Sequence, residues 1–247
     1  MPLKDFLGVP RLDRAKRVLC VQPHPDDNEL GAGGTIAWLA SLDIEIVYLT
    51  VTDGSIGTQD PSISPERLAE TRRGEAERSA RHLGASQLLW LGYRDGDVPE
   101  ERELTARIMG VIRQVKPDAV LVPDPWLPYE AHRDHRLTGL ATAAACILGG
   151  FPHARSGPEA PPHSVPMVGF YCTTRPNTWI NVDATWSRKM EAVRMHASQF
   201  PEGWAMISMY LDMKAREFAQ GRGFTRAEAL KVLPTILLHF NVDSEGY

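Results

Sequence analysis

Short apolar runs alternate with amphipathic stretches along the first half of the chain. The runs are rich in β-branched and aromatic residues, which is typical of buried parallel strands; they lie at 17–22, 44–52, 87–92 and 119–123. Apolar residues recur at helical spacing in the stretches 33–42, 64–84 and about 100–115. Ser64 as N-cap, Pro65 at the first helical position and Gly84 as C-cap delimit the second of these helices.

Strands that alternate with helices predict a doubly wound, Rossmann-like α/β fold. We expect a mostly parallel sheet with helices on both faces and the active site at the carboxyl ends of the strands. The first and fourth strands should adjoin at the point where the strand order reverses. The loops after all four strands are dense in polar residues, which predicts one site along this edge.

The second half of the chain has weaker patterns. The segment 149–166 is rich in proline and glycine and predicts a long loop. Strands are expected at 167–174 and 178–183, a helix over 184–200, and a last strand over 235–242. No repeat or linker divides the chain, so we expect one domain over 1–247, with an N-terminal arm at 1–16.

Composition narrows the class of protein. The 247 residues carry a net charge of −4 and 43% hydrophobic residues, which favours a globular protein that binds neither nucleic acid nor a membrane. The N-terminus lacks the apolar core of a signal peptide and no stretch predicts a membrane span. Three cysteines without paired spacing favour a reducing compartment, so the expected location is cytoplasmic.

The segment VQPHPDDNELGAGG (21–34) permits two interpretations. Gly31 and Gly33 after a strand resemble a dinucleotide-binding turn, which needs G-x-G-x-x-G/A. The sixth position of that pattern is Ile36, however, and the glycines come late after the strand. A nucleotide-binding protein is therefore the weaker alternative, and the glycines are expected to let the following helix pack closely.

The second interpretation is a metal site. His24 and Asp27 are three residues apart in a loop braced by proline, and His132 and His135 follow the fourth strand. Two histidines and a carboxylate suit catalytic Zn²⁺, whose fourth position stays open for water, although such donors also suit iron or cobalt. The competing interpretation makes the aspartates turn residues and the histidines surface residues.

Several further residues are candidates for roles around this site. Asp26 points away from its neighbour Asp27 and could act as general base. Asp134 could orient a neighbouring histidine. Softer candidates are Arg94 and Asp124, which could hold sugar hydroxyls, and His239, which could be catalytic. A surface ion pair for Arg94, a turn role for Asp124 and a strand position for His239 are equally simple accounts.

The segments PHPDDNELGAGG and AHRDH together resemble the PIG-L/LmbE-like family of zinc-dependent N-acetylglucosamine deacetylases. VTDGSIGTQD, YRDGDVP, PDPWLPYEAHRDHRLTG and MHASQFPE resemble its diacetylchitobiose deacetylase subgroup. The resemblance runs from about residue 17 to 240 and is thinnest at 149–166 and at the C-terminus.

The resemblance implies an N-deacetylase that acts on an N-acetylglucosamine-containing saccharide. An amidase that acts on a glucosaminyl conjugate is the nearer alternative. Zn²⁺ would be held by His24, Asp27 and His135, with Asp26 as base and His132 near the reacting carbonyl. The resemblance further implies sugar contacts for Arg94 and Asp124, oxyanion stabilisation by His239, and a homotrimer or homohexamer.

Overall fold

The computed structural model describes residues 3–156, 160–200 and 202–247. Within them one sheet has the strand order β3-β2-β1-β4-β5-β7-β6. The strands are β1 (Arg17–Gln22), β2 (Glu45–Thr52), β3 (Ala85–Tyr93), β4 (Ala119–Pro123), β5 (Met167–Tyr171), β6 (Thr178–Asn181) and β7 (Ala227–Pro234). The first five are parallel to one another, and β7 is antiparallel to both β5 and β6. The predicted mostly parallel sheet is confirmed, with β1 beside β4 at the reversal of strand order.

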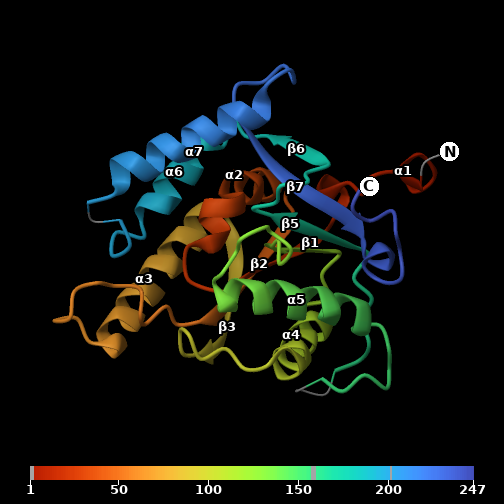
Figure 1. The fold of residues 1–247 in the computed structure, drawn as a ribbon, viewed down its shortest axis with the longest axis horizontal. Coiled ribbons are helices and arrows are strands. Elements are labelled where there is room, and N and C mark those ends of the chain that lie inside the picture. Colours follow the sequence, from red (N-terminus) through yellow and green to blue (C-terminus); the bar gives the residue numbers. More distant parts are fainter. Residues whose placement is uncertain (1–2, 157–159, 201) are drawn as a thin grey trace.

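Helices cover both faces of the sheet (Figure 1). One face packs against α2 (Asp27–Ser41), α3 (Pro65–Leu83) and α6 (Trp186–Arg194); the other packs against α4 (Glu101–Val115) and α5 (Arg133–Leu148). Helix α7 (Trp204–Ala219) lies over β6 and β7. Shorter helices are α1 (Leu3–Leu7), η1 (Leu12–Arg14) and η2 (Thr235–Leu238).

Strand β1 shows how the sequence divides the core between the two faces. Successive side chains of a strand point to opposite faces. Leu19 and Val21 accordingly join the core under α4 and α5, while Val18 and Cys20 join the core under α2 and α3, and all four are fully buried. Burial on both faces explains why this strand has a continuous apolar run.

The ends of α3 are those that the sequence predicts. The Ser64 hydroxyl accepts a hydrogen bond from the Arg67 amide at 3.3 Å. Pro65 opens the helix, and Gly84 ends it in the left-handed region at φ 100°, where a residue without Cβ is favoured.

The predicted strand at 235–242 is wrong. The chain forms η2 there, and the antiparallel strand is β7, immediately before it. Glu228 and Lys231 interrupt the apolar pattern of β7 although both are buried, because each has a polar partner within the fold. Helix α7 also has no counterpart among the predicted elements, and the helix expected over 184–200 ends at Arg194.

The described part of the segment 149–166 has no helix or strand, as expected; residues 157–159 lie outside the described residues. The buried guanidinium of Arg113 holds the start of this segment by donating to the carbonyls of Gly149 (3.1 Å) and Phe151 (2.7 Å).

Among the helices that the structure describes, none combines the length and apolar character needed to cross a membrane.

Candidate metal centre

The loop after β1 places two adjacent carboxylates at the edge of the sheet. Asp27 begins α2, and its carboxylate turns back to accept the His24 amide hydrogen at 2.8 Å. Asp26 adopts φ 127° and ψ −20°, a backbone conformation that is costly for a residue with a Cβ and is concentrated at functional sites. The turn therefore directs two consecutive side chains to different surroundings.

Three side chains from this loop and from α5 converge on one point. His24 Nδ1 lies 3.2 Å from His135 Nε2 and 3.4 Å from one Asp27 oxygen, and His135 Nε2 lies 3.5 Å from the other. Ligand atoms about 2.0–2.2 Å from Zn²⁺ are about 3.3–3.6 Å apart in a tetrahedron. The spacing of the three donors thus fits one tetrahedral ion with a position left open, and the side chains form one of two groups that could hold a metal.

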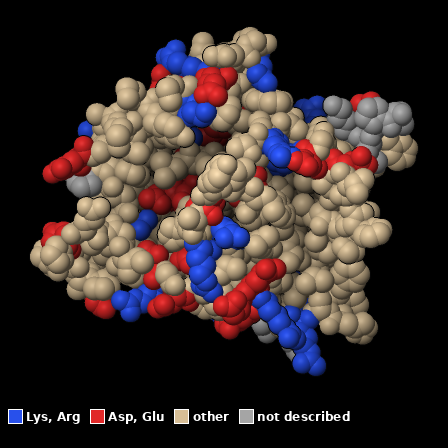
Figure 2. All heavy atoms as spheres, in the orientation of Figure 1, with Lys and Arg blue, Asp and Glu red and all other residues tan. Residues whose placement is uncertain are grey.

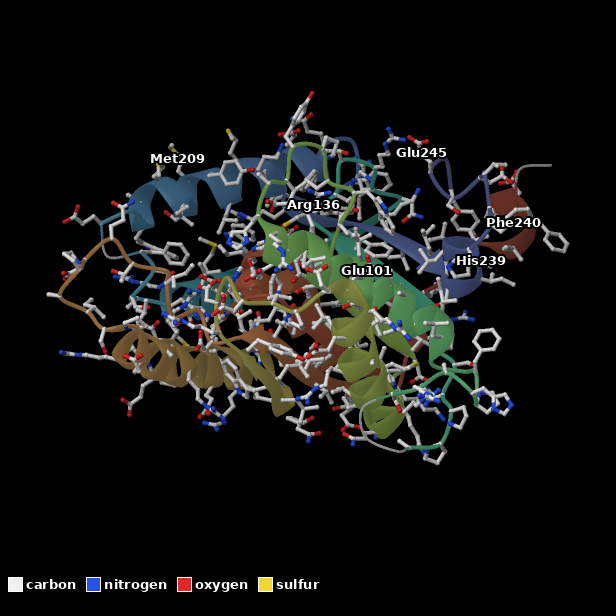
Figure 3. All side chains as sticks on the ribbon, turned by 60° about the horizontal axis from the view of Figure 1, so that its bottom comes forward. Glu101, Arg136, Met209, His239, Phe240 and Glu245 are labelled. Atoms are coloured by element: carbon white, nitrogen blue, oxygen red, sulfur yellow. The ribbon has the colours of Figure 1, made fainter. Side chains whose placement is uncertain are left out.

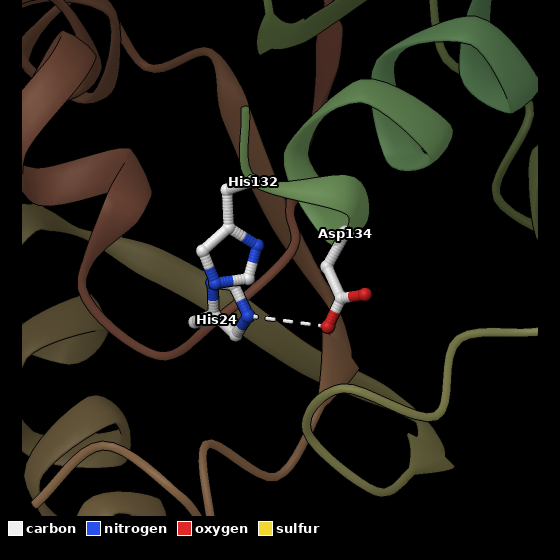
Figure 4. A group of neighbouring side chains, drawn as sticks. All are labelled: His24, His132 and Asp134. Atoms are coloured by element: carbon white, nitrogen blue, oxygen red, sulfur yellow. Dashed lines mark ion pairs between the residues drawn. The ribbon is translucent and has the colours of Figure 1, made fainter. Parts of the chain in front are cut away.

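The opposite edge of the His24 ring faces two carboxylates. Nε2 lies 3.2 Å from Asp95 and 3.4 Å from Asp134, and all three side chains are buried. Figure 4 shows the pair of His24 and Asp134 together with His132, and these three form the second group of described residues that could hold a metal. Carboxylates accept hydrogen bonds, so they favour the proton on Nε2 and leave Nδ1 with its lone pair toward the cluster. The carboxylate of Asp134 thus lies beside His24 from another loop and not beside its own sequence neighbours, and its predicted role of orienting a histidine stays a prediction.

Charge around the cluster shifts the pKa of its members in opposite directions. Burial lowers the pKa of His24, but Asp134, Asp27 and Asp95 outweigh burial and raise it to about 12. Burial raises the pKa of Asp27, yet His135 and His24 together lower it to about 2. The excess of carboxylates over cations in this buried space favours a cation between them.

Asp26 belongs to neither metal-binding group and has a different partner. Its carboxylate lies 3.3 Å from the Arg72 guanidinium, which also donates to the carbonyls of Pro25 (2.7 Å) and Gly54 (3.0 Å). Burial and the charge of Asp27 raise the pKa of Asp26 well above its usual range, while Arg72 opposes them. The result is a buried carboxyl with high proton affinity beside the cluster, which is the property of a general base.

His132 lies against the cluster from the solvent side. Its ring meets the His24 ring edge-on at a centroid distance of 4.7 Å, and the residue is exposed. Partial burial, followed by repulsion from His24 and His135, lowers the pKa of His132. A neutral imidazole at this position can donate a hydrogen bond toward the open side of the cluster.

Arg72 and Asp95 were not among the sequence-based candidates. Arg72 is buried within the charged helix α3, and its surroundings become visible only in three dimensions. A Cβ added to Gly54 would lie 2.6 Å from the Arg72 guanidinium. The glycines of VTDGSIG are the one local signal that a bulky group packs against this loop.

The remaining candidates make no described contact with His24, Asp27 or His135. Arg94 is exposed, and the Asp124 carboxylate accepts the Trp126 amide hydrogen at 2.9 Å, which shapes the turn after β4. His239 follows η2, is exposed and packs on Phe240. In Figures 1 and 3, η2 lies beside the far part of α5, whereas the cluster lies at the first turn of α5. The roles predicted for these three residues stay predictions.

The glycines of the turn pack against protein side chains, and the amides that follow them are already engaged. Gly31 packs on the Tyr171 ring, and a Cβ at Gly34 would lie 2.7 Å from Val182. The amides of Gly34 and Thr35 already donate to the Glu228 carboxylate at 2.9 and 2.6 Å. The expected packing role of the glycines is confirmed, with partners on β5, β7 and the segment after β6.

The surface around the site is hollowed. In the orientation of Figure 1, a hollow lies between α7 and α5, and acidic side chains are visible inside it (Figure 2). A recess with carboxylates and histidines below its opening can admit a small polar molecule to the cluster.

Comparison with known proteins identifies relatives over most of the chain. Residues 19–146 match the family described as PIG-L, GlcNAc-PI de-N-acetylase. A diacetylchitobiose deacetylase of Thermococcus kodakarensis is 43% identical over 239 residues, which are 95% of this chain and 90% of that protein. The 1D-myo-inositol 2-acetamido-2-deoxy-alpha-D-glucopyranoside deacetylase of Kineococcus radiotolerans is 32% identical over 66% of this chain and 54% of its own length.

A solved structure agrees with these relatives. The N,N'-diacetylchitobiose deacetylase from Pyrococcus horikoshii, in complex with an inhibitor, superposes with a TM-score of 0.90 at 35% sequence identity. The match covers 97% of this chain and 93% of that protein. The similarity therefore includes the second half of the chain, beyond the residues that match the family.

Proposed function

Because this chain belongs to the PIG-L family of de-N-acetylases, we propose that it removes the N-acetyl group from an N-acetylglucosamine-containing saccharide such as diacetylchitobiose. The observation that carries the proposal is that the two adjacent aspartates of one loop have different surroundings. His24 and Asp27 share a tetrahedral donor set with His135, while the adjacent Asp26 stays outside that set with a raised pKa.

The donor set fits Zn²⁺, with one ion per chain. A zinc ion held by His24, Asp27 and His135 would polarise the amide carbonyl and make a water molecule more acidic. Asp95 and Asp134 hold the His24 ring in the orientation that this requires. Other divalent ions with the same donor preference are alternatives to zinc.

Asp26 performs the proton transfers in the proposed reaction. Its carboxylate takes a proton from the attacking water and later gives it to the departing amine, so that acetate and a free amino sugar are released. Arg72 keeps the carboxylate in place through its contact at 3.3 Å and its anchors on two backbone carbonyls. His132, as a neutral donor, stabilises the negative charge that develops on the carbonyl oxygen.

Substrate identity rests on the relatives. The chitobiose-type relative covers more of this chain at higher identity than the inositol-type relative, which favours a saccharide over a conjugate with another aglycone. We also infer the homotrimer or homohexamer and the cytoplasmic location that the sequence suggests; light scattering of the purified protein tests the first.

Replacement of Asp26 by Asn tests the proton-transfer role. We expect the bound zinc to stay at one ion per chain while acetate release from diacetylchitobiose falls by about 10²–10⁴-fold. Asp97, exposed in the neighbouring loop, provides the matched control Asp97→Asn, which should keep wild-type turnover. Full activity in the Asp26→Asn variant would exclude the mechanism.

Replacement of His135 by Ala tests the donor set separately. The variant should lose zinc, as measured by atomic emission on purified protein, because two protein ligands hold an ion far less tightly than three. An unchanged stoichiometry would exclude His135 as a ligand. Acetate release from N-acetylglucosamine, diacetylchitobiose and inositol-linked N-acetylglucosamine then ranks the substrate classes.

A further inference from the structure

A cavity beside the metal cluster has no role in the chemistry described above. It encloses about 640 Å³ between α7, the β6–β7 pair and the first turn of α2. Leu30 and Gly31 on its wall follow Asp27 in α2, Leu127 belongs to the loop that leads to His132, and Cys172 follows β5. The cavity and the cluster therefore share three wall segments at the same edge of the sheet.

Aromatic rings line the side of the cavity away from the cluster. Trp186, Tyr210 and Phe218 contribute them from α6 and α7. Tyr210 is 52% exposed, and the face of α7 continues outward from it with Met209, labelled in Figure 3, and Met213. Solvent reaches this wall at Tyr210, while Lys189 and Arg226 lie over the Trp186 ring and Lys214 lies over the Phe218 ring.

Cationic groups lie over one face of two of these rings and are already paired with carboxylates. Lys214 Nζ is 5.4 Å from the centroid of the Phe218 ring and 2.7 Å from the Glu217 carboxylate. Lys189 Nζ is 5.7 Å from the Trp186 ring and 2.6 Å from the Glu228 carboxylate. Paired lysines offer hydrogen bonds without a net positive charge, so the cavity does not suit a phosphate.

A sugar ring has the complementary chemistry. A pyranose presents an apolar face of C–H groups and a rim of hydroxyls, which match a flat aromatic face edged by hydrogen-bonding groups. An alkyl chain would exclude water from these paired charged groups and offer them no hydrogen bond in return, which is unfavourable.

We propose that this cavity binds the second sugar ring of the substrate, the unit linked to the N-acetylglucosamine whose amide is cleaved. The inference rests on the proposed function and deepens it, because it assigns selectivity for saccharides longer than one unit to α6 and α7. The rings of Tyr210 and Phe218 supply the surface on which the second unit lies.

Two alanine variants and a pair of substrates test the assignment. Phe218→Ala and Tyr210→Ala are assayed for acetate release from N-acetylglucosamine and N,N'-diacetylchitobiose. The ratio of kcat/KM for the disaccharide to that for the monosaccharide should fall about tenfold, mainly through KM, because an aromatic contact is lost. Tyr210 is half exposed, so its replacement keeps the test valid if Phe218→Ala does not fold. Phe151→Ala, an exposed phenylalanine in the distant 149–166 segment, should leave the ratio unchanged.

The possible outcomes separate the subsite from the activity. An unchanged ratio in both variants, with both substrates still hydrolysed, overturns the subsite and leaves the deacetylase function intact. Failure of the wild-type protein to hydrolyse either substrate overturns both. If octyl N-acetylglucosaminide outperforms the disaccharide and loses that advantage in the variants, the cavity binds an apolar group and the sugar assignment is wrong.

Discussion

The buried ion pair between Lys189 and Glu228 should make the stability of this fold sensitive to the loss of either partner alone. Lys189 on α6 is 3% exposed and Glu228 on β7 is 4% exposed, and their charged atoms are 2.6 Å apart. The Glu228 carboxylate also accepts the amides of Gly34 and Thr35, just after Ala32 interrupts the helical geometry of α2. One carboxylate therefore joins α6 and β7 and caps the second part of the helix that begins at the metal site.

Glu228→Gln removes the charge but keeps the size of the side chain. The ammonium of Lys189 then keeps neutral acceptors, the Leu30 carbonyl at 2.8 Å and the new amide oxygen, but no opposite charge from a described residue at hydrogen-bond distance. Loss of one partner of a buried pair costs about 3–5 kcal/mol, and the two amides of α2 lose a charged acceptor as well. A domain of this size loses about 2–4 °C in Tm per kcal/mol, so a fall on the order of 10 °C is expected.

Equilibrium denaturation in urea measures this loss, with Lys189→Met and the double variant completing a thermodynamic cycle. The double variant should be more stable than the sum of the single losses predicts, because neither charge is then left alone. A loss below about 1 kcal/mol in Glu228→Gln, or additive losses in the cycle, would refute the account of this pair as a mutually dependent unit.

Three further outcomes follow from the site. Asp95→Asn should weaken zinc binding by about 10–100-fold without removing a ligand, because the His24 ring loses a charged acceptor. Competition with a chelator measures the change, and an unaltered zinc affinity would contradict the proposal that Asp95 orients His24. Zinc removal with a chelator should lower Tm, and re-addition should restore it, since a ligand at 1,000 times its Kd stabilises the folded state by about 4 kcal/mol; equal melting curves would exclude a specific ion. Burial, followed by repulsion from Arg72, lowers the pKa of His196 to about 3 from an ordinary 6.5, so the unfolded chain binds the extra proton and stability falls as pH drops from about 6.5 toward 3. The slope is about 1.4 kcal/mol per pH unit, and urea curves of His196→Gln should lack this component, whereas parallel losses in both proteins would contradict it.

Local patterns predicted most of what lies before residue 148. The strand order around β1 and β4, the caps of α3 and the approach of His24 and Asp27 to the His132–His135 pair follow from apolar runs and from the rule that parallel strands end at one edge. These features depend on short stretches of sequence that are uniformly buried, so the pattern of apolar and polar residues predicts them directly. The choice of His135 over His132 as the third ligand came from the family resemblance.

The features that were missed depend on contacts between distant segments. β7 contains Glu228 and Lys231, whose burial requires partners on α6 and near the C-terminus. Arg72 and Asp95 reach the site from α3 and from the loop after β3 only because the sheet brings those segments together. Arg72 lies 46 positions from its partner Asp26. A pair at that separation has no periodic signature in the sequence, and only the assembled fold identifies it.

The imidazole of His24 links the segments around the proposed metal site before an ion binds. One edge of the ring meets Asp27 and His135, and the other meets Asp95 and Asp134. A single ring thus connects the loops that follow β1 and β3 with the helix that follows β4. The entropy of ordering these segments is therefore lost when the sheet edge folds and not when an ion arrives, so the protein presents an ion with donors that need little rearrangement.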